Sequence, residues 1–257
     1  MVKKTILALV LYLIVVALTI TWTVHIHTVL FHSAWGGLIA AIVIGAIAGV
    51  IRVKLKMKKQ AAAANEHAPR HTVGSFMDHW GTGVGIIILI VSGALLASGR
   101  KIGFFFVPQF TRSRIMALNL HYLGVFFTLI FGCTFLIDFL LSGGYKKLMP
   151  GLADIWDGTI KRYLFRKRWN ERDKYFSSQK SSFLVFTILG VIILITGIIK
   201  VLPFILPVPL NRTNNIHDIA AELFTLMLII HILFVIAVPS HWRLLLSWFT
   251  GKEGLKR

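Results

Sequence analysis

The sequence predicts an all-α membrane protein of about six transmembrane helices, and three observations support this. The chain of 257 residues is 56% hydrophobic and only 15% charged, with a mean hydropathy of +0.76, so it has too little charge to cover a water-soluble domain. Its apolar residues come in blocks long enough to cross a bilayer, which takes roughly 17–25 residues. These blocks lack the alternation of polar and apolar residues typical of membrane strands, which favours helices.

Six such blocks follow one another along the chain. We expect a helix in each of them, at about residues 5–24, 34–52, 76–98, 115–141, 182–202 and 216–239. The first two form an N-terminal transmembrane hairpin within residues 1–60. A basic, alanine-rich linker, residues 61–74, separates this hairpin from a four-helix domain, residues 75–250.

The longest connection, residues 142–181, mixes aromatic and basic side chains. Trp156, Tyr163 and Trp169 alternate irregularly with lysines and arginines. This composition predicts an amphipathic helix that lies in the inner membrane interface. A solvated basic loop is the alternative interpretation.

The net charge of +18 does not indicate a nucleic-acid partner. The lysines and arginines gather in a few loops between the apolar blocks, where they act as topology signals and contact anionic lipid. If the N-terminus is cytoplasmic, 22 of the 28 basic residues lie inside and 6 lie outside. We therefore expect a multi-pass protein with both termini in the cytoplasm.

The single cysteine, Cys133, lies within an apolar block. One cysteine excludes an internal disulfide, a cysteine-based zinc or iron–sulfur site, and the paired attachment of c-type haem. Any haem in this chain must therefore be bound without covalent bonds to cysteine.

Four histidines lie in or at the ends of the last four predicted spans: His79, His121, His217 and His231. Ionisable residues inside membrane spans are rare and usually functional. One such histidine alone could simply hydrogen-bond within a helix bundle. The placement of all four together favours a shared cofactor site.

His217 and His231 are 14 residues apart on one predicted helix, which separates them by about 21 Å along its axis and about 40° around it. The alternating direction of the spans places His121 at the depth of His217, and His79 at the depth of His231. Two pairs at two depths suit two haem irons with histidine on both faces, which transfer electrons and leave no open position for oxygen chemistry. The predicted fold is therefore a four-helix di-haem bundle preceded by the N-terminal hairpin.

Short motifs accompany these histidines over residues 76–248, some two-thirds of the chain. They are Asp78-His79-Trp80, Val91-Ser92-Gly93, Leu120-His121, Lys174-Tyr175, Gln179-Lys180, Thr196-Gly197 and the His217/His231 pair. Together they resemble the cytochrome b (gamma) subunits of respiratory formate dehydrogenases and of related membrane-bound nickel–iron hydrogenases.

The resemblance implies a membrane-anchor subunit that binds two haem b groups through the four histidines. It would transfer electrons between the iron–sulfur subunit of a respiratory dehydrogenase or reductase and the quinone pool, with menaquinone or ubiquinone as substrate. The chain has no soluble domain and no nucleotide or molybdenum motif, so a catalytic subunit must be a further partner. The resemblance also implies the prokaryotic cytoplasmic membrane. Whether the chain itself carries a quinone-reducing or quinol-oxidising site stays open.

The same resemblance implies a quinone site at Tyr175, Gln179 and Lys180. His241, about 15 Å beyond His231 on an unbroken helix, could hydrogen-bond quinone or simply end that helix. Two features depart from the family. The N-terminal hairpin is extra, and residues 176–178 read Phe-Ser-Ser where the family typically has Asn and Gly.

Two alternative functions remain at this point. A small transporter or assembly factor could use the histidines to bind metal ions transiently, which would leave their paired depths unexplained. A stand-alone transmembrane reductase could pass electrons to an external metal chelate, but the short outer loops hardly supply a substrate pocket. The direction of electron flow and the side of the membrane that the partner occupies also stay open.

Overall fold

The computed structural model describes residues 2–62, 72–102, 105–106, 109, 113–167, 175–201, 210–237, 242 and 245–246. Six helices in this part of the chain are long and apolar enough to cross a membrane. The only strands in the described residues are β1 (Lys101–Ile102) and β2 (Phe105–Phe106), of two residues each. The predicted all-α membrane fold is therefore confirmed.

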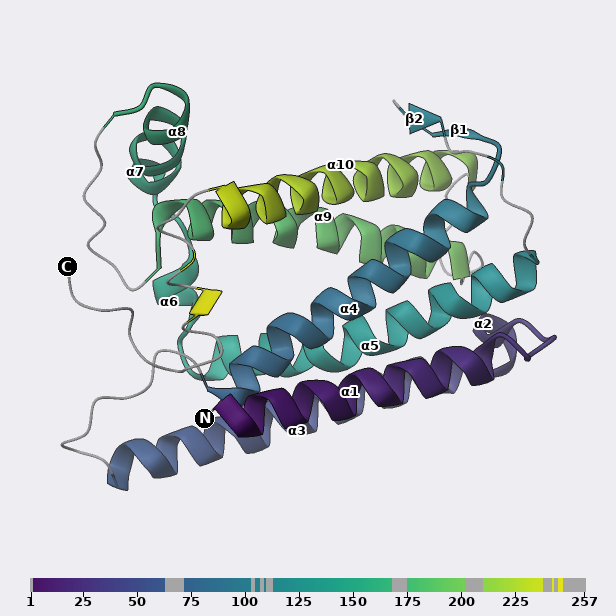
Figure 1. The fold of residues 1–257 in the computed structure, drawn as a ribbon, viewed down its shortest axis with the longest axis horizontal. Coiled ribbons are helices and arrows are strands. Elements are labelled where there is room, and N and C mark those ends of the chain that lie inside the picture. The colour runs from purple at the N-terminus through teal and green to yellow at the C-terminus, as the bar shows by residue number, and fades with distance from the viewer. Residues whose placement is uncertain are drawn as a thin grey trace. The chain divides into compact units, whose positions relative to one another are not determined.

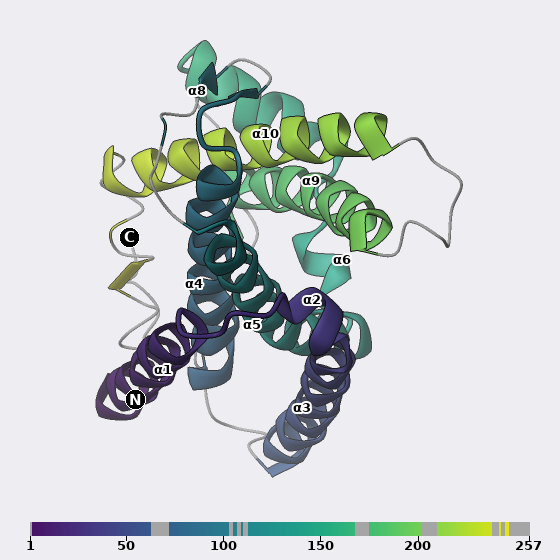
Figure 2. The ribbon, with the colours of Figure 1, turned by 90° about the vertical axis from the view of Figure 1, so that its right-hand side faces the viewer.

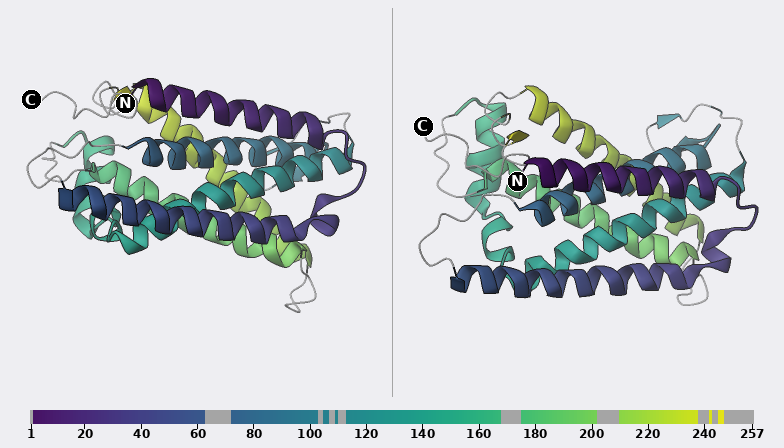
Figure 3. Two further views of the ribbon diagram at one scale, coloured as in Figure 1. Left: turned by 90° about the horizontal axis from the view of Figure 1, so that it is seen from below. Right: turned by 60° about the horizontal axis from the view of Figure 1, so that its bottom comes forward.

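The chain divides into two compact units (Figure 1). Unit 1 comprises Met1–Lys101, Phe106–Ser142 and Phe234–Arg257. Its helices are α1 (Val2–Thr23), α2 (Leu30–Ser33), α3 (Trp35–Ala62), α4 (Val73–Leu96) and α5 (Arg114–Leu141). Helix α5 lies between α3 and α4 (Figure 2), and α1 packs against α4 and α5 (Figure 3). An apolar core forms between α1 and α5 from Tyr12, Val16, Leu123 and Phe127.

The N-terminal hairpin is fastened to α5 by polar contacts at its turn. Asn119 is fully buried; its side-chain oxygen accepts from the Leu30 backbone N–H at 2.9 Å, and its amide donates to the carbonyls of Ile26 and Thr28. The Tyr122 hydroxyl donates to the Ala34 carbonyl at 2.6 Å. Backbone groups of a turn need such partners when water is scarce. The hairpin is therefore an integral part of unit 1.

Glycines allow α3 to approach α5 closely. A Cβ atom at Gly45 would lie 2.5 Å from the Ile130 carbonyl oxygen, and one at Gly49 would lie 2.7 Å from the Ile137 side chain. The Thr134 hydroxyl bonds the Gly45 carbonyl across the same contact at 3.1 Å. Small residues at such crossings are typical of helix packing in membranes.

Unit 2 comprises Ile102–Phe105 and Gly143–Leu233. It contains α6 (Tyr145–Leu148), α7 (Leu152–Ile155), the π-helix η1 (Trp156–Lys161), α8 (Arg162–Leu164), α9 (Ser177–Val201) and most of α10 (Leu210–Ala237). Helices α9 and α10 meet through side chains; for example, the rings of Phe186 and Phe224 lie 5.0 Å apart. Helix α7 and η1 pack against α9.

The helix boundaries differ from the sequence prediction mainly where polar residues extend an apolar span. Helix α3 continues ten residues past the expected end at residue 52, through lysines that form helices well. Helix α10 begins six residues early, in the polar stretch before residue 216. The basic loop is helical from Leu152 to Leu164, with a π-helical turn in the middle; its position in the membrane interface stays a prediction.

Candidate functional site

His217 on α10 is held by a threonine of α9. Its Nδ1 lies 2.9 Å from the Thr196 hydroxyl oxygen, and that hydroxyl lies 2.7 Å from the Ile192 carbonyl, four residues back on its own helix. With the single hydroxyl hydrogen directed to a backbone carbonyl, Ile192 at 2.7 Å or Ile193 at 3.1 Å, the oxygen is left to accept from Nδ1–H. The imidazole is then the tautomer whose Nε2 carries a free lone pair, which is the form that ligates a metal.

His121 on α5 has the same arrangement with a serine of α4. Its Nδ1 lies 3.0 Å from the Ser92 hydroxyl, and that hydroxyl lies 2.7 Å from the Ile88 carbonyl. The Ser92 side chain is fully buried. The same geometry lets the Ser92 oxygen accept from Nδ1–H of His121 when the hydroxyl hydrogen is directed to the Ile88 carbonyl.

The other two histidines contact aromatic rings. His79 on α4 is exposed and meets Trp80 edge-on, with 5.6 Å between ring centroids. His231 on α10 meets Phe186 of α9 edge-on at 5.8 Å. Of the four histidines singled out from the sequence, His79 and His121 therefore lie in unit 1, and His217 and His231 lie in unit 2.

The two histidines of a unit are too far apart to bind one iron. On α10, 14 residues place His217 and His231 about 21 Å apart along the axis. In unit 1, His121 is level with Ser92, which is 13 residues and therefore about 20 Å beyond His79 on α4. Metal–nitrogen bonds are about 2 Å long, so two axial nitrogens on one iron are only about 4 Å apart. The histidine spacing is nearly equal in the two units.

The two histidines of unit 1 also lie over one face of α4. Gly93 is 14 residues after His79, which places it within about 40° of the same face. A Cβ atom at Gly93 would lie 4.0 Å from Cε1 of His121. His121, although carried by α5, therefore lies over the face of α4 that bears His79. This mirrors α10, where His217 and His231 share a face by the same interval.

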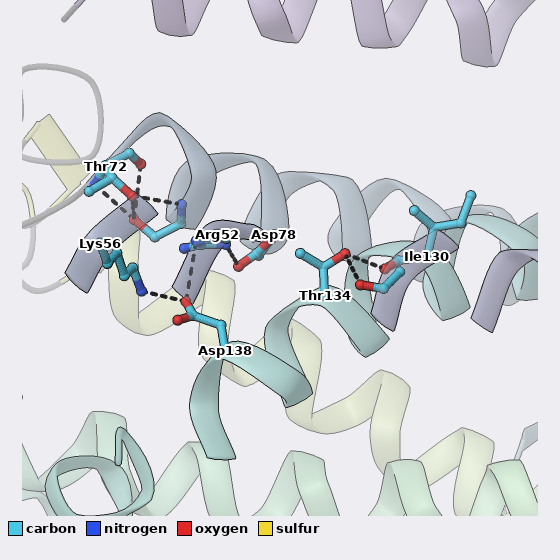
Figure 4. A network of polar contacts seen from close by, with 9 residues as sticks. Arg52, Lys56, Thr72, Asp78, Ile130, Thr134 and Asp138 are labelled. Carbon is cyan, nitrogen blue, oxygen red and sulfur yellow. Dashed lines mark hydrogen bonds and ion pairs between the residues drawn. The ribbon is translucent and has the colours of Figure 1, made fainter. Parts of the chain in front are cut away.

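A network of charged residues borders His79 in unit 1 (Figure 4). Arg52 of α3 bonds Asp78 of α4, the residue before His79, and its Nε lies 3.2 Å from a carboxylate oxygen of Asp138 on α5. Lys56 Nζ lies 2.5 Å from the same Asp138 oxygen. Both acids are buried, so the cations offset the cost of burying their charges. The sequence pattern did not predict that the hairpin supplies these cations.

The residues expected at a quinone site fall at the beginning of α9. Lys180 is buried, with 4% of its surface exposed, and its Nζ lies 3.2 Å from a carboxylate oxygen of Asp154 on α7. Gln179 Oε1 accepts from the Phe176 backbone N–H at 3.1 Å. Tyr175 is half-buried, and His241 lies outside the described residues. The structure therefore brings Tyr175, Gln179 and Lys180 to one helix end.

Asp154 is a member of this cluster that the sequence did not single out. Burial raises the pKa of its carboxyl, but hydrogen bonds from the Gly151 backbone N–H, the Ser177 hydroxyl and Lys180, together with the lysine charge, outweigh burial and hold that pKa below its ordinary value. The Ser177 hydroxyl donates at 2.8 Å. The only available signal was an acid in a basic loop, which does not identify a partner.

The described residues contain no group of three or more histidine, cysteine or acidic side chains that could hold a metal ion. This disfavours transient metal binding by the histidines of that part of the chain. It is compatible with a macrocycle that supplies four of the ligands of its own iron.

The comparisons with known proteins agree with this geometry. Residues 70–251, well over half of the chain, match the family described as prokaryotic cytochrome b561. No curated protein and no solved structure matches the chain. The matched segment begins after the N-terminal hairpin and includes all four histidines. The chain belongs to the prokaryotic cytochrome b561 family, multi-pass membrane proteins that bind haem b and transfer electrons.

Proposed function

We propose that this protein is the di-haem membrane subunit of a respiratory oxidoreductase complex. It carries electrons between the iron–sulfur subunit of a dehydrogenase or reductase and the quinone pool. The observation that carries the proposal is the matched spacing of the histidines. The two candidate ligands within each unit are about 20 Å apart, so they would not hold the same iron.

The pairing of the histidines in this proposal comes from the order of the spans in the sequence. The alternating direction of the spans pairs His121 with His217 and His79 with His231. Bound haem b supplies the one-electron chemistry. The residues of the chain would hold and orient it: the four histidines would ligate the iron, and the Ser92 and Thr196 hydroxyls would accept from Nδ1 of His121 and His217.

A reduced-minus-oxidised visible spectrum of the purified protein, with haem quantified per chain, tests this proposal. We expect two haem b groups per polypeptide, both low-spin because both axial positions are occupied. A colourless protein from haem-replete cells would refute the proposal. One haem per chain would refute its two-site form.

The quinone site belongs at the beginning of α9, with Tyr175, Gln179 and Lys180 as its residues and His241 as a further candidate. The support is the position of Lys180, which is buried at the beginning of α9, with its Nζ 3.2 Å from a carboxylate oxygen of Asp154. A lysine Nζ can donate hydrogen bonds, which is the contact that a quinone carbonyl needs.

The quinone assignment is tested by the rate at which a soluble quinol analogue reduces the haem in Lys180→Met. We expect a rate at least tenfold lower with unchanged haem content. Lys161→Met is the matched control, because Lys161 pairs with the more exposed Asp157 at 2.6 Å. Equal rates in the two variants would remove Lys180 from the site.

We place both termini in the cytoplasm from the distribution of lysine and arginine. The basic segment that precedes α9 then faces the cytoplasm together with the quinone site. Reporter fusions at the two ends of the chain test this orientation, and activity of a periplasm-specific reporter at either end would contradict it.

A further inference from the structure

The two hydroxyl–histidine contacts repeat one arrangement in two separate places. On α4 the acceptor is Ser92, followed by Gly93, and on α9 it is Thr196, followed by Gly197. In each case the hydroxyl donates to the carbonyl four residues back at 2.7 Å. It lies 3.0 or 2.9 Å from the histidine Nδ1 of the neighbouring helix.

Each histidine ring lies beside the glycine that follows the hydroxyl residue. A Cβ atom at Gly93 would lie 4.0 Å from Cε1 of His121, and one at Gly197 would lie 3.6 Å from Cε1 of His217, which are ordinary van der Waals distances. The contact with the hydroxyl is therefore the one that orients the imidazole.

From this geometry we propose that Ser92 and Thr196 are positioning residues that lock the tautomer of His121 and His217 and set the redox potential of the iron they bind. The inference rests on the proposed function, because it takes these two histidines as haem ligands. It goes further by assigning a role to two side chains that touch neither the iron nor a substrate.

The physical basis is the coupling between the two ring nitrogens. A proton held on Nδ1 leaves the Nε2 lone pair for the metal. The hydrogen bond from Nδ1–H to an acceptor also makes the ring a stronger electron donor, as partners behind metal-ligating histidines generally do. A stronger donor stabilises the ferric state over the ferrous state, so each hydroxyl lowers the midpoint potential.

The burial of both hydroxyl residues strengthens the effect. Ser92 is fully buried and Thr196 is 7% exposed, so water does not readily replace the lost acceptor. Without the hydroxyl, a buried Nδ1–H is left without this partner, and the ring gains freedom to rotate or to exchange tautomers.

The test is a redox titration and a low-temperature EPR spectrum of the holoprotein carrying Ser92→Ala or Thr196→Val. Valine keeps the shape of threonine and removes only the hydroxyl. We expect each variant to retain haem, with one midpoint potential higher than in the wild type and a shifted low-spin EPR signal. Loss of one haem by these two variants, with both haems retained in the controls described below, would also support the proposal.

Two control variants distinguish loss of the hydroxyl–histidine hydrogen bond from a general disturbance of the fold. Thr196→Ser restores the hydroxyl and should restore the wild-type potential. Thr187→Val removes another hydroxyl from α9, one that bonds the Phe183 carbonyl at 2.8 Å, and should leave both potentials unchanged. Wild-type potentials and EPR signals in both Ser92→Ala and Thr196→Val would overturn the inference while leaving the proposed function intact. A wild-type chain without haem would overturn the proposed function itself.

Discussion

Units 1 and 2 present their histidines in similar ways but are supported very differently. In α5 of unit 1, 28% of the most apolar 18-residue stretch is buried against protein, compared with 6% in α9 of unit 2. Unit 1 has the hairpin, close glycine contacts and a charged network that includes Asp78, the residue before His79. Unit 2 has a few aromatic and hydroxyl contacts between α9 and α10.

Two pairs of histidines with nearly equal spacing can therefore be carried by helices that are packed against protein to very different extents. Unit 1 positions its histidines through its own packing, because α3 and α4 are both fixed to α5. In unit 2 the contacts between the two spans are sparse, so bound haem has more to contribute to their order. Ligands that bind only the native state stabilise the elements they contact.

The largest expected effect follows from removing the cofactor. In protein from haem-deficient cells, we expect amide hydrogen exchange in α9 and α10 to rise far more than exchange in α3, α4 and α5. The reason is the smaller protein burial of the unit 2 spans. Hydrogen exchange measured by mass spectrometry in detergent compares the two forms, and an equal rise in both units would contradict this account of unit 2.

The next effect concerns the charged network of unit 1. Asp138→Asn leaves Arg52 and Lys56 without this carboxylate, and removing one member of a buried ion pair costs about 3 kcal/mol. We expect a clearly lower free energy of unfolding in a mixed-micelle denaturation series. The control is Asp157→Asn, where the partner Lys161 is one helical turn away and solvent is near, so the loss is about 0.5 kcal/mol or less. Equal losses in the two variants would show that the network does not stabilise the fold.

The smallest effect is a pH dependence at the beginning of α9. The pKa of Asp154 is held below its ordinary value, which is about 3.9 in an unfolded chain. Its ion pair therefore stabilises the fold fully above about pH 4, and this contribution is lost as the pH falls through the folded-state pKa. The stability difference between wild type and Asp154→Asn should be present at neutral pH and shrink in acid. A difference that is constant down to pH 3 would contradict the assignment.

Hydropathy alone predicted six spans, because a bilayer demands long apolar stretches whatever their packing. It did not predict how the hairpin is bound. The Asn119 contacts join residues about 90 positions apart, and they depend on the rotation of each helix, which apolar composition does not specify. The ends of α3 and α10 were misplaced because a helix can continue beyond the hydrocarbon into polar sequence.

The four histidines could be found because ionisable side chains are rare in spans. Their hydroxyl partners could not be assigned as partners. A serine or threonine in a membrane helix commonly bonds its own backbone, as Thr187 and Thr225 do here. Ser92 and Thr196 belong to the motifs Val91-Ser92-Gly93 and Thr196-Gly197, but a motif does not specify which side chain the hydroxyl contacts. Asp154 was missed for a similar reason, since its pairing with Lys180 depends on the fold of the basic loop.

The pairing of the four histidines into two haem sites is tested most directly by the haem content and midpoint potentials of single variants. The four variants are His79→Ala, His121→Ala, His217→Ala and His231→Ala. The control is His27→Ala, which changes an exposed histidine. The account predicts that His217→Ala and His231→Ala lose different haems, because their separation of about 21 Å excludes a shared iron. We further expect His121→Ala to lose the same haem as His217→Ala, and His79→Ala to lose the same haem as His231→Ala. The control variant should keep both haems. Loss of the same haem by both α10 variants, or two intact haems in any of the four, would contradict it.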